Sequence, residues 1–313
     1  MKDVSIIIVN WNTKDILRDC LMSVYAQTQN ITYELIVVDN ASFDGSAEMV
    51  KKEFPAVILI ENIRNAGFAA ANNQGMQIAN GRYFLLLNPD TIILDGAVQK
   101  TSTFADEHTD IGVLGCQVWI NEQEIQQTCF SFPSLSGLLF QETGLRRLFP
   151  NSRFFGRSNY GWWDRKNQLD VEVVSGMYML VRRKAVEQVG MMDEDYFVYA
   201  EEADWCYRFW KADWRCVFTP EARIIHLDGG SQSTAQISVK MFVQMQKSML
   251  IFFRKQKGIG SWLCAKSVFL FSMFFKYFIF LGLSVLKKNE SFLKKSKQAL
   301  AALKFHLFRL EPK

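Results

Sequence analysis

The sequence predicts an α/β protein with a mostly parallel central sheet, and two observations carry this prediction. Over residues 4–114, short apolar and β-branched runs alternate with segments of helical periodicity, which is typical of βαβ units. Polar turns directly follow some of the apolar runs, above all Asn88-Pro89-Asp90 after residues 83–87. Ligands of open α/β sheets bind at the carboxyl ends of the strands, so these turns also predict where a site lies.

The individual elements follow from the same periodicities. Strands are expected at residues 4–9, 34–38, 57–60, 83–87 and 111–114. Helices are expected between them, at residues 16–24, 46–53, 69–79 and 96–107. After an irregular stretch, the pattern predicts a strand at 171–181, helices at 184–189 and 201–211, strands at 216–218 and 223–226, and a long helix near 237–256.

The composition indicates a packed globular protein with unevenly distributed charge. Its 313 residues are 49% hydrophobic, which is ample for a core. The formal net charge is +4, and residues 287–313 contain eight Lys or Arg and two Glu. A basic tail after an apolar stretch favours an anionic membrane surface over nucleic acid, although solvated tail charges would give the same composition.

Cysteine usage and the N-terminal segment indicate the compartment. The six cysteines form no CxxC pair and no spacing that suits zinc, so we expect free thiols in a reducing environment. The apolar run at residues 4–9 meets polar residues too soon for a secretory signal. The sequence therefore predicts a cytoplasmic protein.

Two regions differ from the α/β pattern. Residues 121–170 carry scattered aromatics with little periodicity and are expected to form an irregular insertion over one end of the sheet. Residues 262–286 are apolar, but Lys266 and Lys276 interrupt them and the longest uncharged run is ten residues. A spanning helix needs roughly 18, so we expect residues 236–313 to form amphipathic, basic helices resting on a membrane. A helical hairpin packed on the protein, or an oligomer interface, would have the same composition.

The first predicted binding element is the turn after residues 34–38. Asp39 stands at the end of that strand, where a carboxylate can accept hydrogen bonds from a ribose or a base. Asn40 and Ser42 continue the turn toward the next helix, and a plain turn with an N-cap would explain them equally well.

The second is Asn65-Ala66-Gly67-Phe68, followed by small residues up to Asn72. Small side chains let a ligand approach the backbone, and a helix N-terminus favours phosphate. A tightly packed helix entrance would have the same composition.

Asp90 is the predicted metal ligand. Mg²⁺ and Mn²⁺ are commonly held by one or two carboxylates and substrate phosphates, and Asn88 stands in the place of a second carboxylate. His226, just before the glycine turn Leu227-Asp228-Gly229-Gly230-Ser231, could supply a further ligand. An Asn-Pro-Asp turn and a structural histidine are the alternative.

Three carboxylates gather at a predicted helix start, at Glu201, Glu202 and Asp204. The helix dipole stabilises acids there, which explains some of them. Three acids within four residues exceed what capping needs, so one of them is a possible general base.

Taken together, these segments resemble the family 2 glycosyltransferases, especially the rhamnosyltransferase-like branch that builds bacterial surface polysaccharides. The resemblance covers about residues 3–235, and its motifs occur in the family's order. They are the strand with Asn10-Trp11-Asn12, Val38-Asp39-Asn40-Ala41-Ser42, Asn65 to Asn72, Leu87-Asn88-Pro89-Asp90, Val174-Ser175-Gly176-Met177, and Tyr196 to Cys206.

The resemblance implies a single GT-A type domain at residues 1–235, with 121–170 on the acceptor side, acting by inversion. Asp39 would then contact the nucleotide, Asp90 would bind the cation, and the Glu201-Glu202 pair would contain the base. The family usually has Glu-Asp at this pair, whereas Glu202 stands in the second position here. His226 with Gly229-Gly230-Ser231 is similar to a late element for metal and diphosphate.

The implied activity is Mg²⁺- or Mn²⁺-dependent transfer from a nucleotide sugar to a polyprenyl-diphosphate-linked saccharide in polysaccharide or O-antigen assembly, at the cytoplasmic face of the inner membrane. dTDP-rhamnose is favoured, while UDP- and GDP-sugars and an oligomeric state stay open. A noncatalytic nucleotide-sugar-binding subunit is the alternative. A nucleotidyltransferase would need a Gly-rich basic loop near the N-terminus, and residues 10–13 are not one.

Overall fold

A computed structural model of the chain describes residues 1–121, 123–227 and 239–308. Its centre is a ten-stranded sheet with the path β3-β2-β1-β4-β11-β6-β12-β5. β7 lies beside β6, β9 lies beside β12, and β8 pairs with β10 in a separate ribbon. The strands are β1 (Lys2–Asn10), β2 (Tyr33–Asp39), β3 (Ile58–Glu61), β4 (Gly81–Leu87), β5 (Thr91–Ile93), β6 (Ile111–Asn121), β7 (Glu124–Ile125), β8 (Cys129–Phe130), β9 (Leu169–Asp170), β10 (Val173–Val174), β11 (Tyr178–Arg182) and β12 (Arg215–His226).

The predicted α/β class with a mostly parallel sheet is confirmed. β1 runs parallel to β2 and β4, β2 to β3, and β6 to β12, whereas β11 and β5 run antiparallel to their neighbours. Asn10 pairs in register with Asp39, and Tyr178 at the start of β11 pairs with Leu87 at the end of β4. The ends of β1, β2 and β4 and the start of β11 therefore meet at one edge.

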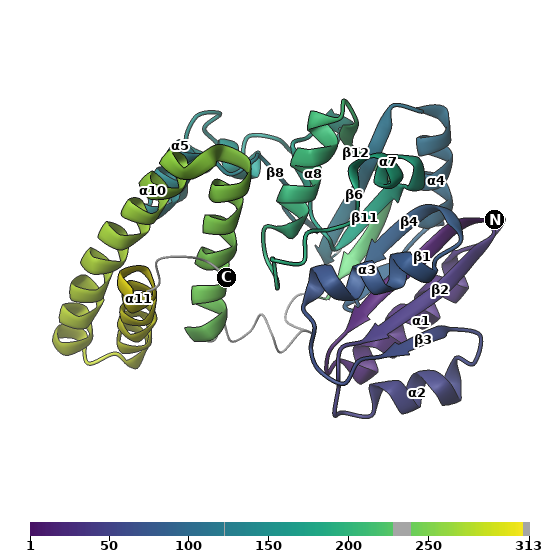
Figure 1. Cartoon of the computed structure of the whole chain (residues 1–313), viewed down its shortest axis with the longest axis horizontal. Coiled ribbons are helices and arrows are strands. Elements are labelled where there is room, and N and C mark those ends of the chain that lie inside the picture. Colours follow the sequence, from purple (N-terminus) through teal and green to yellow (C-terminus); the bar gives the residue numbers. More distant parts are fainter. Residues whose placement is uncertain (122, 228–238, 309–313) are drawn as a thin grey trace.

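Helices cover both faces of the sheet (Figure 1). One core holds Ile6 and Ile8 with apolar residues of α1, α2 and α4, and the other holds Ile7 and Val38 with residues of α3, α7 and α8. This division follows from strand geometry, since neighbouring residues of β1 point to opposite faces. The helices are α1 (Lys14–Gln27), α2 (Ser46–Glu53), α3 (Phe68–Ile78), α4 (Ala97–Glu107), α7 (Arg183–Val189) and α8 (Glu201–Lys211).

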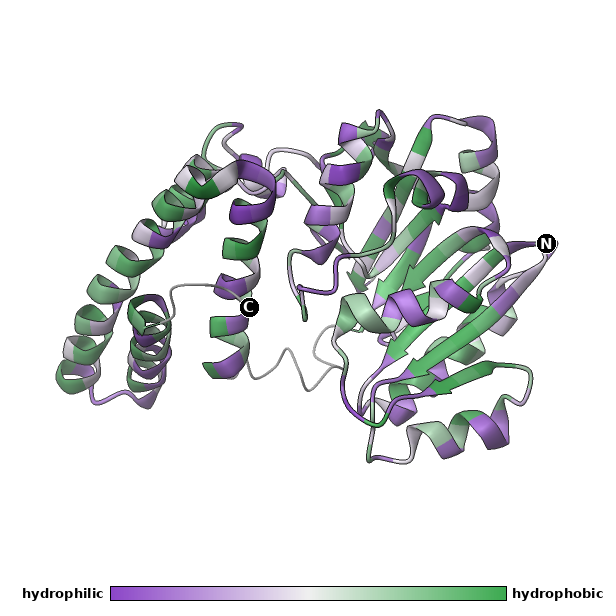
Figure 2. Cartoon of the chain, in the orientation of Figure 1, coloured by the Kyte–Doolittle hydropathy of each residue, from purple (hydrophilic) through white to green (hydrophobic). Residues whose placement is uncertain are grey.

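The C-terminal part is a long bent helix with a second helix beside it. α10 (Val239–Lys287) bends at Gly258, whose φ of 82° is left-handed, and α11 (Glu290–Phe308) packs on its second half through Ala299 and Ala302 against Met273. The first half belongs to the main body, because Phe252 lies in the core that contains α8. α10 is long and apolar enough to cross a membrane by length and composition alone, and Figure 2 shows the apolar character of its second half.

The insertion at 121–170 contains more regular structure than its sequence predicts. It forms α5 (Leu135–Glu142), α6 (Leu145–Leu148) and the 3₁₀ turn η1 (Arg157–Asn159). α5 packs on α10, where Leu138 contacts the cluster of Phe253 and Trp262. Lys276 Nζ of α10 also lies 2.6 Å from Glu142 Oε2 of α5. The short helices depend on this tertiary packing, which leaves little periodicity in the sequence.

Three predicted strands differ from the observed ones. The expected strand at 171–181 is divided into β10 and β11 by Ser175-Gly176-Met177, whereas the two strands expected at 216–218 and 223–226 form one strand, β12, with an irregularity between Thr219 and Arg223. A fourth, predicted at residues 111–114, extends to Asn121 as β6, and β5 was not predicted. β5 follows Asp90 directly and pairs with β12, so the turn at Asp90 is held between two strands.

Candidate active site

The first group of predicted residues forms a hydrogen-bonded cluster at the ends of β1 and β2. The Asn10 amide donates to Asp39 Oδ2 at 2.8 Å and to Ser42 Oγ at 3.0 Å, and the Ser42 N–H donates to Asp39 Oδ1 at 2.8 Å. The Asn12 N–H donates to Ser42 Oγ at 2.9 Å, and the Asn12 side chain accepts from Phe43. Each Asp39 oxygen keeps a further lone pair for a ligand.

Asn40 joins this cluster to the N-terminus of α3. Its side chain donates to the Gly67 carbonyl at 3.1 Å and accepts from the Ala66 N–H at 3.2 Å. The Asn65 side chain accepts from the Gly67 N–H at 2.9 Å, and Asn72 donates to the Phe68 carbonyl at 2.9 Å. The turn at residues 39–42 and the turn at residues 65–68 thus form one hydrogen-bonded wall. The Asn72 side chain bonds to the first turn of α3 itself.

Gly67 permits a close approach between this wall and the loop that precedes α8. Its φ is 88°, and a Cβ there would lie 2.4 Å from the Phe197 carbonyl oxygen. The same carbonyl accepts the Phe68 N–H at 2.7 Å. The loop then passes through two left-handed residues, Tyr199 and Ala200, directly before Glu201. The backbone here has little freedom, because left-handed conformations are costly for residues with side chains.

Gly176 brings the start of β11 to the same place. Its N–H donates to Glu202 Oε1 at 3.1 Å, and a Cβ there would lie 2.9 Å from the Phe68 ring and 3.0 Å from Glu202 Oε1. Phe68, Gly176 and Glu202, predicted from three separate motifs, therefore converge.

The two neighbouring glutamates differ in surroundings. Glu201 is 2% exposed and its Oε2 has no hydrogen-bond partner, whereas Glu202 is only partly buried. Burial, and then the adjacent charge of Glu202, raise the pKa of Glu201 well above its usual range. Burial also raises the pKa of Glu202. Glu202 is thus the more accessible carboxylate of the pair.

Asp204 is fully engaged inside the protein. It is 0% exposed, its Oδ2 accepts from Arg208 Nε at 2.9 Å, and its Oδ1 accepts from Gln256 Nε2 at 2.7 Å. The Tyr196 hydroxyl donates to the same Oδ1 at 3.3 Å. Of the three acids at the start of α8, Asp204 is therefore the one that geometry places in a supporting position, joining α8 to α10.

Asp90 and His226 are brought together as a pair. His226 Nε2 lies 3.3 Å from Asp90 Oδ2, and the Leu227 N–H donates to the Asp90 carbonyl at 2.8 Å. His226 Nδ1 lies 2.9 Å from Gln126 Oε1, so the Nδ1–H donates to Gln126 and Nε2 faces Asp90. Asn88 holds the turn through its backbone, because its N–H donates to the Met177 carbonyl at 3.1 Å.

This pair fits a divalent cation that substrate oxygens complete. Asp90 is 4% exposed and its Oδ1 is buried without a hydrogen-bond partner. Such an atom is costly unless a ligand satisfies it. Within the described ranges, no group of three or more His, Cys, Asp or Glu side chains could hold a metal, so these described residues would supply two ligands. Gly229, Gly230 and Ser231, predicted to follow His226 in this role, lie outside the described residues.

Sequence reasoning did not find several supporting residues. Gln126, which orients His226, lies in the insertion, where no pattern marks it. Ser248 donates to the Val198 carbonyl at 2.7 Å, and Gln256 donates to Asp204, but both lie about 50 residues further along the chain, on α10. Only the folded chain shows that α10 supports the loop before α8.

The layers and the strand order define a GT-A type fold, and sequence comparison gives the family. The glycosyl transferase family 2 model matches residues 5–190, and the chain belongs to this family. A similar structure is that of the mannosyltransferase PcManGT from Pyrobaculum calidifontis in complex with GDP-Man and Mn²⁺. It has a TM-score of 0.56 at 14% identity, covering 99% of this chain and 90% of that one.

Two curated relatives show modest identity. The low-salt glycan biosynthesis hexosyltransferase Agl10 of Haloferax volcanii is 25% identical over 212 residues, which are 66% of this chain and 62% of that protein. The N-acetylglucosaminyl-diphospho-decaprenol L-rhamnosyltransferase of Mycobacterium tuberculosis is 26% identical over 234 residues, 70% of this chain and 73% of that protein. The chain thus spans less than two thirds of the Haloferax relative.

Proposed function

We propose that the protein is an inverting, metal-dependent glycosyltransferase that moves a sugar from a nucleotide-sugar donor to a lipid-linked saccharide. The observation that carries the proposal is Asp90, whose buried Oδ1 lacks a partner and whose Oδ2 lies 3.3 Å from His226 Nε2. Membership of glycosyl transferase family 2 supports it. Glu202, with its Oε1 bonded to Gly176, supplies the second functional group.

On the donor side, the hydrogen-bonded wall would hold the nucleotide and the metal pair would hold its diphosphate. The residues of the wall that would face the nucleotide are Asn10, Asn12, Asp39, Asn40 and Ser42. Asp90 and His226 would bind Mg²⁺ or Mn²⁺. When bound, the cation neutralises charge on the departing diphosphate. The rhamnosyltransferase relative favours dTDP-rhamnose as the donor, while the neighbour solved with GDP-Man keeps other nucleotide sugars in consideration.

On the acceptor side, Glu202 would take the proton of the attacking hydroxyl. Its raised pKa makes it a stronger base than an ordinary glutamate. As the hydroxyl oxygen bonds to the anomeric carbon from one face, the bond from that carbon to the diphosphate oxygen breaks on the other, so the configuration inverts. Glu201, whose pKa is raised further by burial, would stay protonated and add no negative charge beside the base.

The relative that acts on N-acetylglucosaminyl-diphospho-decaprenol supports a polyprenyl-diphosphate-linked acceptor. The exposed apolar residues of α10, among them Phe271, Phe275 and Phe278, would rest on the cytoplasmic face of the membrane where such a lipid is found. The reaction would then belong to the assembly of a cell-surface polysaccharide.

The test is calorimetric binding of nucleotide sugars with and without Mn²⁺, followed by turnover of wild type and Glu202→Gln. The panel contains dTDP-rhamnose, UDP-GlcNAc, UDP-galactose and GDP-mannose. We expect metal-dependent binding of one donor, unchanged in Glu202→Gln, and turnover about 10²- to 10⁴-fold lower in that variant. Glu187→Gln, on the exposed side of α7, is the matched control. Donor binding without turnover by the wild type would instead indicate a noncatalytic nucleotide-sugar-binding subunit.

A further inference from the structure

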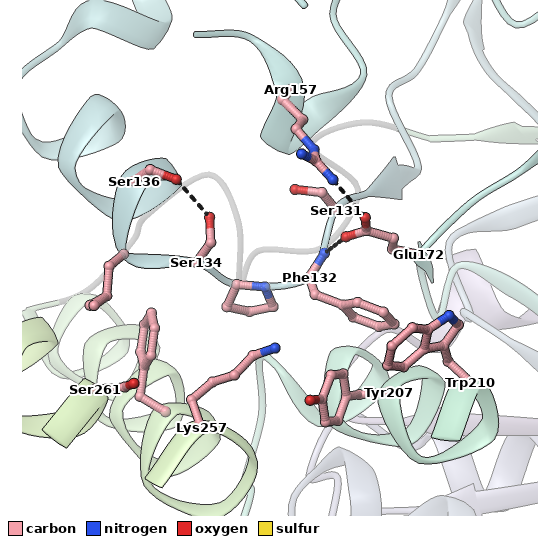
Figure 3. A pocket seen from close by; sticks show the side chains of 13 residues that line it. Ser131, Phe132, Ser134, Ser136, Arg157, Glu172, Tyr207, Trp210, Lys257 and Ser261 are labelled. Carbon is pink, nitrogen blue, oxygen red and sulfur yellow. Dashed lines mark hydrogen bonds and ion pairs between the residues drawn. The ribbon is translucent and has the colours of Figure 1, made fainter. Parts of the chain in front are cut away.

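A concave site lies away from Glu202 and from the Asp90–His226 pair, where three parts of the chain meet. A pocket of about 630 Å³ is bounded by residues 131–136 of the insertion, the C-terminal half of α8 and the bend of α10. Figure 3 shows Lys257 of α10 reaching into it between Phe132 and Tyr207. None of these residues is used in the proposed donor site.

The wall formed by α8 is aromatic. The Phe132 ring lies edge-on to Tyr207 at 5.0 Å and to Trp210 at 5.9 Å between ring centroids. Tyr207 is buried, whereas Trp210 is 58% exposed and leaves much of its indole uncovered. An exposed aromatic ring beside a pocket that also carries polar groups is suited to stack on a sugar ring.

The charge of the pocket favours an anion. Lys257 lines the pocket, and its Nζ lies 4.3 Å from the centroid of the Tyr207 ring. Lys211 stands beside the pocket on α8, with its Nζ 4.6 Å from the same centroid and 3.4 Å from Gln256 Oε1, so the two ammonium groups are no more than about 9 Å apart. Neither forms an ion pair with a described carboxylate. Glu172, the acid of the pocket, is already bonded to the Phe132 N–H and lies 3.2 Å from Arg157. Ammonium groups without a carboxylate partner favour a bound anion.

The position of the pocket relates it to both ends of a lipid-linked acceptor. Trp210 is eight residues along α8 from Glu202, which places it about 12 Å from the base along the helix axis. On the other side, Ser261 lines the pocket and opens the apolar second half of α10, where Leu263 is 52% exposed. An anionic group here would stand between the catalytic carboxylate and the apolar helix.

We infer that this pocket binds the diphosphate that links the acceptor saccharide to its lipid, with Lys211 and Lys257 holding phosphate oxygens and Trp210 stacking on the adjoining sugar. The inference rests on the proposed function for the identity of the ligand. The phosphate-binding property of the pocket does not, and it can be measured without transfer.

The experiment uses the full chain in EDTA, so that the metal-dependent donor site is not engaged. Three probes are titrated: inorganic pyrophosphate, N-acetylglucosaminyl diphosphate with a short alkyl chain, and the same alkyl glycoside without phosphate. We expect the Kd of both phosphate probes to rise about tenfold or more in Lys211→Gln/Lys257→Gln, because charge-assisted bonds are lost. Lys184→Gln/Lys240→Gln, an equal charge change at exposed positions on α7 and elsewhere on α10, should leave it unchanged.

Trp210→Leu separates the sugar from the phosphate. It should weaken the saccharide probe severalfold and leave pyrophosphate unaffected. Equal affinity of wild type and the double lysine variant for both phosphate probes, or equally tight binding of the phosphate-free glycoside, would overturn the inference. If the lysines matter for phosphate binding but no nucleotide sugar binds with Mn²⁺, the pocket stands as an anion site and the proposed function fails.

Discussion

Glu201 and Glu202 are adjacent in sequence and yet meet different surroundings. Glu201 is buried with one oxygen unbonded, while Glu202 is partly exposed and bonded to the Gly176 N–H. Two carboxyl groups whose environments differ in this way can divide their tasks, one staying neutral and the other accepting a proton. We therefore expect a negative charge on Glu201 to destabilise the fold and not to be needed for the chemistry.

Glu201→Gln tests this destabilisation through the pH dependence of the free energy of unfolding. Because the folded-state pKa of Glu201 is raised, the wild type loses stability as pH rises from the unfolded pKa of about 4.5 through the folded one. The loss is about 1.4 kcal/mol for every unit by which the two pKa values differ. We expect the free energy of unfolding of Glu201→Gln to gain on the wild type between pH 5 and pH 8, measured by urea denaturation. A constant difference across that range would contradict the raised pKa.

Gln126 should tune metal affinity without being a ligand. It accepts the Nδ1–H of His226 at 2.9 Å and so presents Nε2 toward Asp90. Partners of this kind typically contribute 10- to 100-fold to metal affinity. We expect Gln126→Ala to weaken Mn²⁺ binding about tenfold in the presence of a nucleoside diphosphate, measured by calorimetry, and exposed Gln123→Ala to leave it unchanged. Equal weakening in both variants would show that the effect comes from the insertion as a whole.

At the scale of elements, the start of α3 and the loop before α8 depend on each other. Gly67 has a left-handed φ of 88°, and its missing Cβ leaves room for the Phe197 carbonyl, which accepts the Phe68 N–H. This contact fixes the distance between the turn that opens α3 and the helix that carries Glu202. A side chain at Gly67 would have to push the two elements apart.

Gly67→Ala should therefore lower both stability and donor affinity. The strained φ and the 2.4 Å contact together predict a loss of about 1–3 kcal/mol in the free energy of unfolding. Gly260→Ala is the contrasting change, because a Cβ there meets nothing within 4 Å and no positive φ is required. That variant should be neutral or slightly more stable, since alanine favours helix. Thermal unfolding of both, with and without donor, measures the difference.

The helices and strands differ in how far their sequences predict them. α2 was predicted with its observed bounds, because its helical apolar spacing is local. β10 and β11 were predicted as one strand, since the break at Gly176 results from its contacts with Phe68 and Glu202, which lie far away in the sequence. Asp90 and His226 were predicted because they follow or end predicted strands, whereas Gln126 and Gln256 have no local sequence pattern that marks them. Support from distant elements is therefore the part that the sequence does not show.

For the whole molecule, exposed apolar side chains gather on the second half of α10, whose ribbon is largely hydrophobic in Figure 2. The second half of α10 exposes a run of aromatic side chains, and Lys287, Lys288, Lys294 and Lys295 follow it. Apolar surface beside basic charge is suited to an anionic lipid interface. It is also the surface on which a lipid-linked acceptor would arrive.

We therefore expect the purified protein to sediment with vesicles containing phosphatidylglycerol, and to bind less well to neutral vesicles. Phe275→Ser/Phe278→Ser, at positions 59% and 54% exposed, should reduce binding about tenfold or more, because two bulky apolar groups no longer enter the interface. Ile63→Ser, at a 99% exposed position on the α/β body, should have no effect. Unchanged sedimentation of the double variant would favour α10 as a contact surface for protein.

The hydrogen bonds from α10 to the loop before α8 and to α8 itself have a consequence for any shortened form of the chain. Ser248 and Gln256 hold Val198 and Asp204 at the base of the loop, and both precede the bend at Gly258. Deleting everything after the sheet to obtain a more tractable protein would remove these contacts and leave the loop before Glu202 and the start of α8 without their support from α10. A cut placed just after the bend at Gly258 would remove the apolar second half of α10. It would keep the part of α10 that carries Ser248 and Gln256 and their contacts to Val198 and Asp204.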